Sequence, residues 1–456
     1  MNSNDNSKSV DIMLGNPKKA LISMSVPLIV SLLISSLYNL IDAAWVSGLG
    51  ADALAGVGFF TPKFMILVGF GNGLGAGAAF AISKYIGEEN KSKADNASIH
   101  SILIDVVVSI IITVVLLIFI IPILNAMGAG QTISYATDYG NIIVIGSIFI
   151  ILSNALYGIY RGEGDSKRPM YAMMASAILN MILDPIFIYT FNLGVKGAAV
   201  ATLISALFVI LIMIYWFYIK KDTYLKPVFA NFNFRKDIST DIVKVGLPAN
   251  IQLLNNAFFA AVFSALLAFV GSTDSVAVYA TGWRIVIIGT TPILAIGTAL
   301  ISVVAANYGA KNYRNIQTAH RYAMKISLVL GIAVMILTNV FAADIASIFA
   351  SSGSSVRIAG ELTAFLSWIV IYYPTMAAGV ASTYVFQGLG MGITAMFQTI
   401  MRETGFTILF AYILAIVLGF GVWGAWMGIV LGEIVSNNLT MIWADWKIKK
   451  LIKHNG

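Results

Sequence analysis

Apolar residues fall into long runs separated by short polar or glycine-rich breaks. Each run reaches the length of about 20 residues that an α-helix needs to cross a bilayer. The runs contain few charges, and backbone groups in lipid must be satisfied within each segment, so we expect helices rather than a barrel of alternating strands. The twelve predicted helices cover residues 20–47, 54–82, 99–121, 138–159, 170–191, 198–219, 241–269, 275–306, 319–342, 358–386, 393–418 and 424–446.

Most of the 28 lysines and arginines lie in alternate breaks between these runs. Because basic residues concentrate in cytoplasmic loops, this alternation predicts twelve crossings with both termini in the cytoplasm. The predicted outer loops hold only Lys196 and Arg357, while Lys63, Arg284 and Arg402 lie within the runs.

The two halves of the chain resemble each other at a nearly constant spacing. Four pairs of motifs recur in the same order: Pro27 with Pro248, Gly87-Glu-Glu-Asn90 with Gly309-Ala-Lys-Asn312, Gly162-Glu-Gly164 with Gly388-Leu-Gly390, and Gly194-Val-Lys-Gly197 with Gly421-Val-Trp-Gly424. An even number of helices in each copy gives both the same topology, as in parallel repeats. We therefore expect an all-α integral membrane protein with twelve transmembrane helices in two pseudo-symmetric six-helix lobes around a central cleft. The lobes would comprise residues 1–219 and 241–456, joined by a cytoplasmic linker at 220–240.

The composition argues against a soluble protein, a nucleic-acid-binding protein and an enzyme. Hydrophobic residues make up 59% of the chain and charged residues 11%, whereas about a quarter of the residues of a soluble protein are charged. The net charge of +7 fits basic cytoplasmic loops better than nucleic-acid binding. The chain has no cysteine and no His-Glu-x-x-His pattern, so we expect neither an enzyme nor a protein with a resident cofactor.

Ionisable side chains at membrane depth are costly and are retained mainly where they face an interior cavity. In the first predicted helix, Asp42 lies within the apolar run, with Tyr38 and Asn39 one turn earlier on the same face. A binding role and simple interhelical hydrogen bonding are both open for a single buried aspartate.

A second polar stripe runs along the fifth predicted helix. Ser176, Asn180 and Asp184 are spaced by four residues, and Thr202 lies one turn into the next helix. Oxygen donors of this kind suit a hard cation, and a carboxyl group in apolar surroundings suits a proton. Two acidic residues with an aligned asparagine favour a coupling-ion site for H⁺ or Na⁺ at Asp42, Asn180, Asp184 and Thr202.

Further polar residues could line a substrate cavity. The candidates are Tyr38, Asn39, Tyr139, Asn154, Ser176 and Met173, although helix packing and interfacial anchoring are open alternatives for Tyr139 and Asn154. Asp105 lies near the cytoplasmic end of its predicted helix, where we expect it to reach water.

In the second half of the chain, acidic residues of the predicted helices are accompanied by an arginine. Arg402, Glu403 and Glu433 lie in the last two predicted helices, and we expect an intramembrane ion pair among them. Arg284 could attract anionic groups or pair with a carboxylate. A series of glycines between Gly69 and Gly77 predicts close helix packing rather than a nucleotide-binding loop, because no strand precedes it.

The segment Leu179-Asn180-Met-Ile-Leu-Asp184-Pro185, followed by Gly194-Val-Lys-Gly197-Ala-Ala-Val-Ala-Thr202, resembles the MATE family of multidrug and toxic compound extrusion transporters. The stretches Tyr38-Asn39-Leu-Ile-Asp42 and Arg161-Gly162-Glu-Gly164-Asp165 resemble other parts of the same family, and the similarity covers essentially the whole chain.

This resemblance implies twelve helices in two lobes and export of amphiphilic, often cationic compounds, driven by inward movement of H⁺ or Na⁺. The acidic residues of spans one and five resemble those of the DinF-like branch, which implies that Asp42 and Asp184 form the coupling pair, with Asn180 and Thr202 as neighbours. Where the NorM-like branch has an acidic residue, this chain has Asn256, so a similar ion site in the second lobe is not expected.

We therefore expect a monomeric multidrug efflux antiporter of the cell membrane that binds small organic substrates and no nucleic acid. The main alternative is a lipid-linked oligosaccharide flippase of the same broader superfamily. Such flippases often have extra helices and a more basic cavity. An ion channel is a further alternative, which unitary current would reveal.

Overall fold

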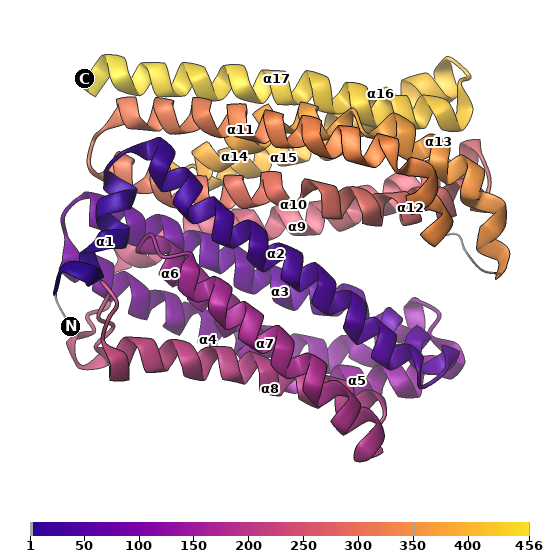
Figure 1. The fold of residues 1–456 in the computed structure, drawn as a ribbon, viewed down its shortest axis with the longest axis horizontal. Coiled ribbons are helices and arrows are strands. Elements are labelled where there is room, and N and C mark those ends of the chain that lie inside the picture. Colours follow the sequence, from indigo (N-terminus) through magenta and orange to yellow (C-terminus); the bar gives the residue numbers. More distant parts are fainter. Residues whose placement is uncertain (1–2, 350–352, 456) are drawn as a thin grey trace. The chain divides into compact units, whose positions relative to one another are not determined.

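The computed structural model describes residues 3–349 and 353–455, and it is helical almost throughout (Figure 1). The chain divides into two compact units, Met1–Gly15 with Ser23–Asn250, and Asn16–Ile22 with Ile251–Gly456. The first unit contains α1 (Ser3–Leu14), most of α2 (Pro17–Ser47), α3 (Ala51–Gly87), α4 (Lys91–Ala126), η1 (Gly130–Thr132), α5 (Ile133–Ile145), α6 (Ser147–Gly162), α7 (Lys167–Pro185), η2 (Ile186–Thr190), α8 (Val195–Ile214), η3 (Tyr215–Lys220) and η4 (Phe229–Asn231).

The main part of the second unit begins at Ile251, within α9 (Lys236–Val270). It contains α10 (Thr273–Gly309), α11 (Tyr313–Val340), α12 (Ala342–Phe349), η5 (Gly353–Ile358), α13 (Ala359–Ile369), α14 (Tyr372–Gly388), α15 (Gly392–Ile400), η6 (Met401–Thr407), α16 (Ile408–Tyr412), η7 (Ile413–Val417) and α17 (Gly421–Asn455). Within this unit α11, α14 and α17 pack side by side (Figure 1).

The helices are long enough to account for the predicted crossings. In the part of the chain that the structure describes, nine continuous segments are long and apolar enough to cross a membrane, and two bent pairs form broken spans. The 35 residues of α17 supply one more helix of spanning length. The expected all-α membrane architecture is therefore confirmed, and α1 is an additional short helix that its polar sequence did not indicate.

Two of the predicted spans are broken rather than continuous. The predicted helix 138–159 is divided at Gly146 between α5 and α6, which are bent by 54°. The predicted helix 358–386 is divided between α13 and α14, bent by 49°. Pro374 lies in the first turn of α14, where its missing N–H is tolerated, and its ring disfavours helix in the residues before it.

The predicted repeat is visible in the backbone. Asn90 caps the start of α4 by accepting a hydrogen bond from the Lys93 N–H, and Asn312 caps α11 in the same way. The residues before these caps, Glu89 and Lys311, both have a positive φ, 55° and 58°. The same unusual left-handed residue before the same cap in both halves supports an internal duplication.

The glycine series in α3 lets other helices approach its backbone. A Cβ atom added to Gly158 of α6 would lie 2.1 Å from the Gly75 carbonyl oxygen, and one added to Gly77 would lie 2.2 Å from the Ile242 carbonyl oxygen. Because only glycine permits contacts this short, the predicted role of the series in helix packing is confirmed.

The segment predicted as the linker, 220–240, belongs to the first compact unit, and the division between units falls after Asn250, within α9. The helix α9 already begins at Lys236, five residues before the predicted span.

Candidate functional site

Helices α2 and α7 bring the two candidate aspartates of the first unit together. The carboxyl groups of Asp42 on α2 and Asp184 on α7 lie next to each other. Asp184 is fully buried and Asp42 is half-buried. Two carboxylates this close repel each other when both are ionised, so a proton or a cation between them would stabilise the pair.

Two tyrosines and a threonine complete this cluster. The side chains of Tyr38 on α2 and Tyr139 on α5 both lie near Thr202 on α8. The Thr202 hydroxyl donates to the Ala198 carbonyl at 3.0 Å. Both tyrosines also lie near Asp42 and Asp184. Four helices therefore contribute to one polar cluster.

The local sequence explains how each side chain enters the cluster. Tyr38 and Asp42 are four residues apart and share one face of α2. Asn180 precedes Asp184 by one turn of α7 and is buried, 1% exposed, on the same face. The α-helix ends at Pro185 and the chain continues as the π-helical η2, so Asp184 lies where the hydrogen-bonding pattern of the span changes.

The donors present suit either of the expected ions. Two carboxyl groups, an amide and hydroxyl oxygens are the ligand types that a hard cation prefers, and the paired carboxyls can share a proton. Asp42 Oδ1 is buried and has no hydrogen-bond partner, which leaves an open acceptor at the centre of the cluster. The described residues contain no group of three or more histidines and acidic residues close enough to hold a metal ion.

The remaining cavity candidates lie in other surroundings. Ser176 donates from its hydroxyl to the Ser205 carbonyl at 3.0 Å and so joins α7 to α8. The Asn154 amide donates to the Ile150 carbonyl of its own helix at 2.8 Å. Asn39 is exposed, unlike Tyr38 and Asp42, and Met173 is half-buried. Asn39 and Asp42 are three residues apart on α2, as a shared helix face requires, and a substrate role for these residues stays a prediction.

One contact next to the cluster was not predicted. The Tyr189 hydroxyl donates to the Trp45 carbonyl at 2.5 Å, which fastens η2 to α2 just beyond Asp42. A Cβ atom on Gly48 would lie 2.2 Å from that hydroxyl, so the glycine leaves room for the contact. The Gly48-Leu-Gly50 turn was the only signal in the sequence, and it does not identify the partner.

The acidic residues of the second unit form the expected ion pair. Arg402 Nη2 lies 2.9 Å from Glu403 Oε1, and Arg402 Nε lies 3.8 Å from Glu433 Oε1. Asn255 and Asn437 donate to the same two carboxylates at 3.0 and 2.8 Å. These carboxylates are held by fixed partners, which confirms the structural interpretation. Arg284 is exposed.

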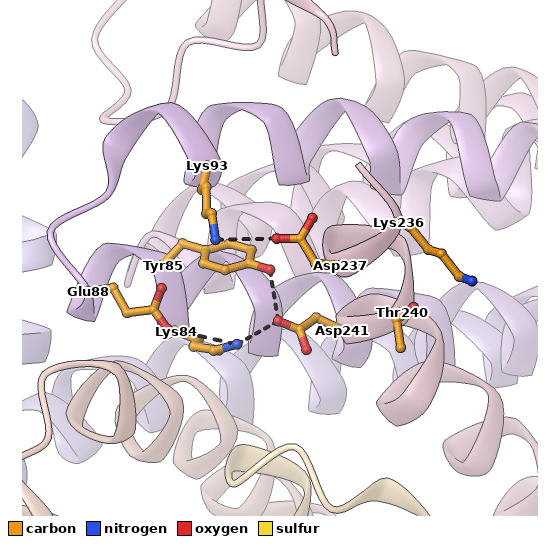
Figure 2. A pocket seen from close by; sticks show the side chains of 8 residues that line it. All are labelled: Lys84, Tyr85, Glu88, Lys93, Lys236, Asp237, Thr240 and Asp241. Carbon is orange, nitrogen blue, oxygen red and sulfur yellow. Dashed lines mark hydrogen bonds and ion pairs between the residues drawn. The ribbon is translucent and has the colours of Figure 1, made fainter. Parts of the chain in front are cut away.

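A second polar region lies at the basic ends of α3, α4 and α9, around a crevice of about 460 Å³ (Figure 2). Asp241 accepts hydrogen bonds from Lys84 at 2.7 Å and Tyr85 at 2.8 Å, and Lys93 lies 3.3 Å from Asp237. Because these acidic groups are already paired with lysines, the crevice offers little uncompensated charge to a ligand.

Comparison with known proteins gives consistent results over almost the whole chain. The chain is 37% identical to a solved outward-facing multidrug resistance MATE family transporter of the MOP superfamily, with a TM-score of 0.94 over 98% of this chain and 99% of that one. A MOP superfamily transporter from Pyrococcus furiosus, described as having a binding pocket of reversed polarity that suggests a different function, is 36% identical, with a TM-score of 0.94 over 97% and 98%. The multidrug export protein MepA of Staphylococcus aureus is 27% identical over 86% of this chain and 83% of its own.

The family model named MatE matches twice, at residues 27–186 and 248–413. The two matches correspond to the two copies of the repeat and together cover most of the chain. The solved relatives also have the twelve-helix fold expected from the sequence. The chain therefore belongs to the MatE family of membrane transporters.

Proposed function

We propose that this protein is a multidrug efflux antiporter in which H⁺ or Na⁺ entry drives export through the Asp42–Asp184 cluster. The observation that carries the proposal is the close approach of two carboxyl groups among helices of the first unit, with Asp184 fully buried and Asp42 half-buried. In this proposal Asn180 and Thr202 supply further oxygen donors, and Tyr38 and Tyr139 hold Thr202 in place.

The carboxyl pair gives the coupling ion a physical means of changing the structure. A shared proton or a bound Na⁺ holds α2 and α7 together at Asp42 and Asp184. When the ion leaves, the two ionised carboxylates repel each other; at a separation of about 4 Å and an effective dielectric constant of about 20, such repulsion is about 4 kcal/mol. A ligand shifts a conformational equilibrium only through such a difference between states. Release of the ion therefore favours a state in which α2 and α7 separate at this point.

The substrates are proposed from the relatives and from the chain's charge. A multidrug resistance transporter and a multidrug export protein are among the matched relatives, so we infer small amphiphilic or cationic organic substrates. We further propose a monomer in the cell membrane with both termini cytoplasmic, since basic residues concentrate at one side of the predicted helices.

The flippase alternative is not favoured. A multidrug resistance MATE family transporter and a multidrug export protein are among the matched relatives. The Pyrococcus furiosus relative is described as having a binding pocket of reversed polarity that suggests a different function, so transport assays must include anionic as well as cationic compounds.

The proposal predicts that Asp184→Asn in proteoliposomes reduces gradient-driven export of an organic cation by about tenfold, or about 1.4 kcal/mol of coupling. Proton and sodium gradients are imposed separately, and exchange of substrate without a gradient is measured in the same vesicles. Asp138→Asn is the matched control, because that carboxylate lies in the same unit but is 46% exposed and paired with Lys196. Export by Asp184→Asn at the parental rate would contradict the coupling role.

A further inference from the structure

Asp105 on α4 is an acidic residue that the coupling cluster does not use. Its side chain is 1% exposed, and neither carboxyl oxygen has a hydrogen-bond partner. The expectation that Asp105 reaches water is therefore wrong. The helix begins at Lys91, 14 residues earlier, so Asp105 lies about 21 Å along α4 from its basic end, and α3 and α6 pack against this helix.

Several charged or titratable groups around α4 have partners other than Asp105. The helices packed against α4 are α3, α5 and α6. Their buried titratable side chains are Lys63, Tyr85, Tyr139, Tyr157, Tyr160 and Arg161. Lys63 donates to the Phe59 carbonyl, Tyr85 to Asp241 and Tyr160 to the Met213 carbonyl. Among the described residues no hydrogen bond or ion pair to Asp105 is found, and its carboxyl group is buried.

The nearest polar groups on the same helix face are arranged as acceptors. Ser101 and Ser109 lie one turn before and one turn after Asp105, and both are buried. The Ser101 hydroxyl donates to the Ala97 carbonyl and the Ser109 hydroxyl to the Val106 carbonyl. The oxygen atoms of these two hydroxyls can then only accept a hydrogen bond from Asp105. A protonated Asp105 carboxyl group could donate to them, whereas an Asp105 carboxylate would find no donor there.

This polar face continues toward the coupling cluster. One turn beyond Ser109, Thr113 is hydrogen-bonded through its hydroxyl to that of Ser147 at 2.5 Å, at the break between α5 and α6. The preceding residue, Gly146, packs against Leu203, where an added Cβ atom would lie 2.2 Å from the Leu203 side chain. Leu203 is the neighbour of Thr202. Polar side chains at four-residue spacing thus lead along α4 to Ser147 at the break between α5 and α6, and the adjacent Gly146 packs against α8, the helix that carries Thr202.

We propose that Asp105 is a second proton-binding carboxyl of the first unit and relays protons along α4 between the basic end of the helix and the Asp42–Asp184 pair. This inference rests on the proposed function and adds a site and a route to it. The step is a proton transfer only: Asp105 gives its proton to a hydroxyl or water on the route, which passes its own proton to the next acceptor, and the Asp105 carboxylate then accepts a proton from the opposite side. The route therefore requires H⁺ as the coupling ion.

The first test measures the proton on Asp105 directly. Infrared difference spectra of the purified full-length protein between acidic and alkaline buffer report each protonated carboxyl. We expect Asp105→Asn to lack one such band that the control Asp52→Asn keeps, since Asp52 is exposed at the start of α3. Identical spectra for the parent and Asp105→Asn would overturn the proposal.

The second test measures the relay in proteoliposomes. Under a proton gradient we expect export by Asp105→Asn to fall by about tenfold, export by Asp105→Glu to recover, and substrate exchange without net proton flow to stay unchanged. Parental export by Asp105→Asn, or export driven by sodium alone, would overturn the relay. Failure of the parent under every gradient would instead refute the proposed function, and the infrared bands would still decide whether Asp105 binds a proton.

Discussion

At the scale of single residues, Asp42 and Asp184 lie together on α2 and α7. Both could be selected from the sequence because acidic groups in apolar runs are costly. Tyr139, predicted only as a cavity residue, lies near Thr202, as Tyr38 does. That contact depends on packing between α5 and α8, which are distant in sequence, so no local pattern could reveal it. The role of these residues stays a prediction until transport is measured.

Glu163, just after α6, shows how burial affects a residue outside the spans. Its Oε2 accepts a hydrogen bond from the Leu225 N–H at 2.9 Å, and Arg168 lies 3.8 Å from Oε1. Burial, with a contribution from the nearby Asp165, raises the pKa of Glu163 to about 8 despite these partners. Between its ordinary pKa and about 8, the folded protein therefore binds more protons here than the unfolded chain.

This shift predicts that Glu163 weakens the fold as pH rises. The neutral form of Glu163 contributes to the free energy of unfolding. This contribution is fully present below the ordinary glutamate pKa and is lost as pH rises through about 8; each unit by which folding shifts the pKa corresponds to about 1.4 kcal/mol. Glu163→Gln keeps an acceptor for Leu225 and should raise the melting temperature at about pH 9 while changing it little at about pH 5.

The control for this experiment is Glu361→Gln, which changes an exposed glutamate in the first turn of α13. Thermal unfolding of detergent-purified protein across the pH range gives the comparison. A parent and a Glu163→Gln variant with parallel pH profiles would contradict the predicted shift.

At the scale of helices, hydrophobic patterning identified the spans because each crossing must satisfy its own backbone. It did not identify where spans break. The break before α14 had a signal, since Pro374 follows closely, whereas the break at Gly146 depends on packing of that glycine against Leu203. Glycine spacing did indicate the close contact of α3 with α6, because small residues are needed wherever helix backbones meet.

That contact gives a prediction about helix packing. Gly158→Ala places a methyl group 2.1 Å from the Gly75 carbonyl oxygen, so we expect it to destabilise the protein by about 1–3 kcal/mol. Gly58→Ala is the matched control, because its Cβ atom has nothing within 4 Å and alanine favours helix by about 1 kcal/mol. Melting temperatures of the two variants should therefore move in opposite directions, and a shift in the same direction would argue against the tight contact.

At the scale of the whole molecule, the two halves share a backbone but differ in their charges. The first unit holds two neighbouring carboxyl groups, Asp42 and Asp184, and the second holds Arg402 between two glutamates. The shared backbone was predictable from recurring glycine and asparagine motifs. The different chemistry was visible only as the positions of acidic residues, and their pairing required the folded structure.

The predicted orientation can be tested because the chain has no cysteine. Single cysteines in place of Lys220 and Lys449 should react with a membrane-impermeant maleimide from the cytoplasmic side, and those in place of Lys196 and Arg357 from the outside. All four side chains are exposed, so reactivity reports the side of the membrane. Labelling of all four from one side would refute the arrangement of both termini in the cytoplasm.

The left-handed residue and asparagine cap that begin both α4 and α11 have a consequence for the origin of the chain. The same turn with the same backbone handedness in both copies is what duplication of one six-helix segment would leave. Once duplicated, two copies in one polypeptide can differ in their polar residues while they keep the same turns. Here one copy brings two carboxyl groups together and the other pairs its carboxylates with Arg402.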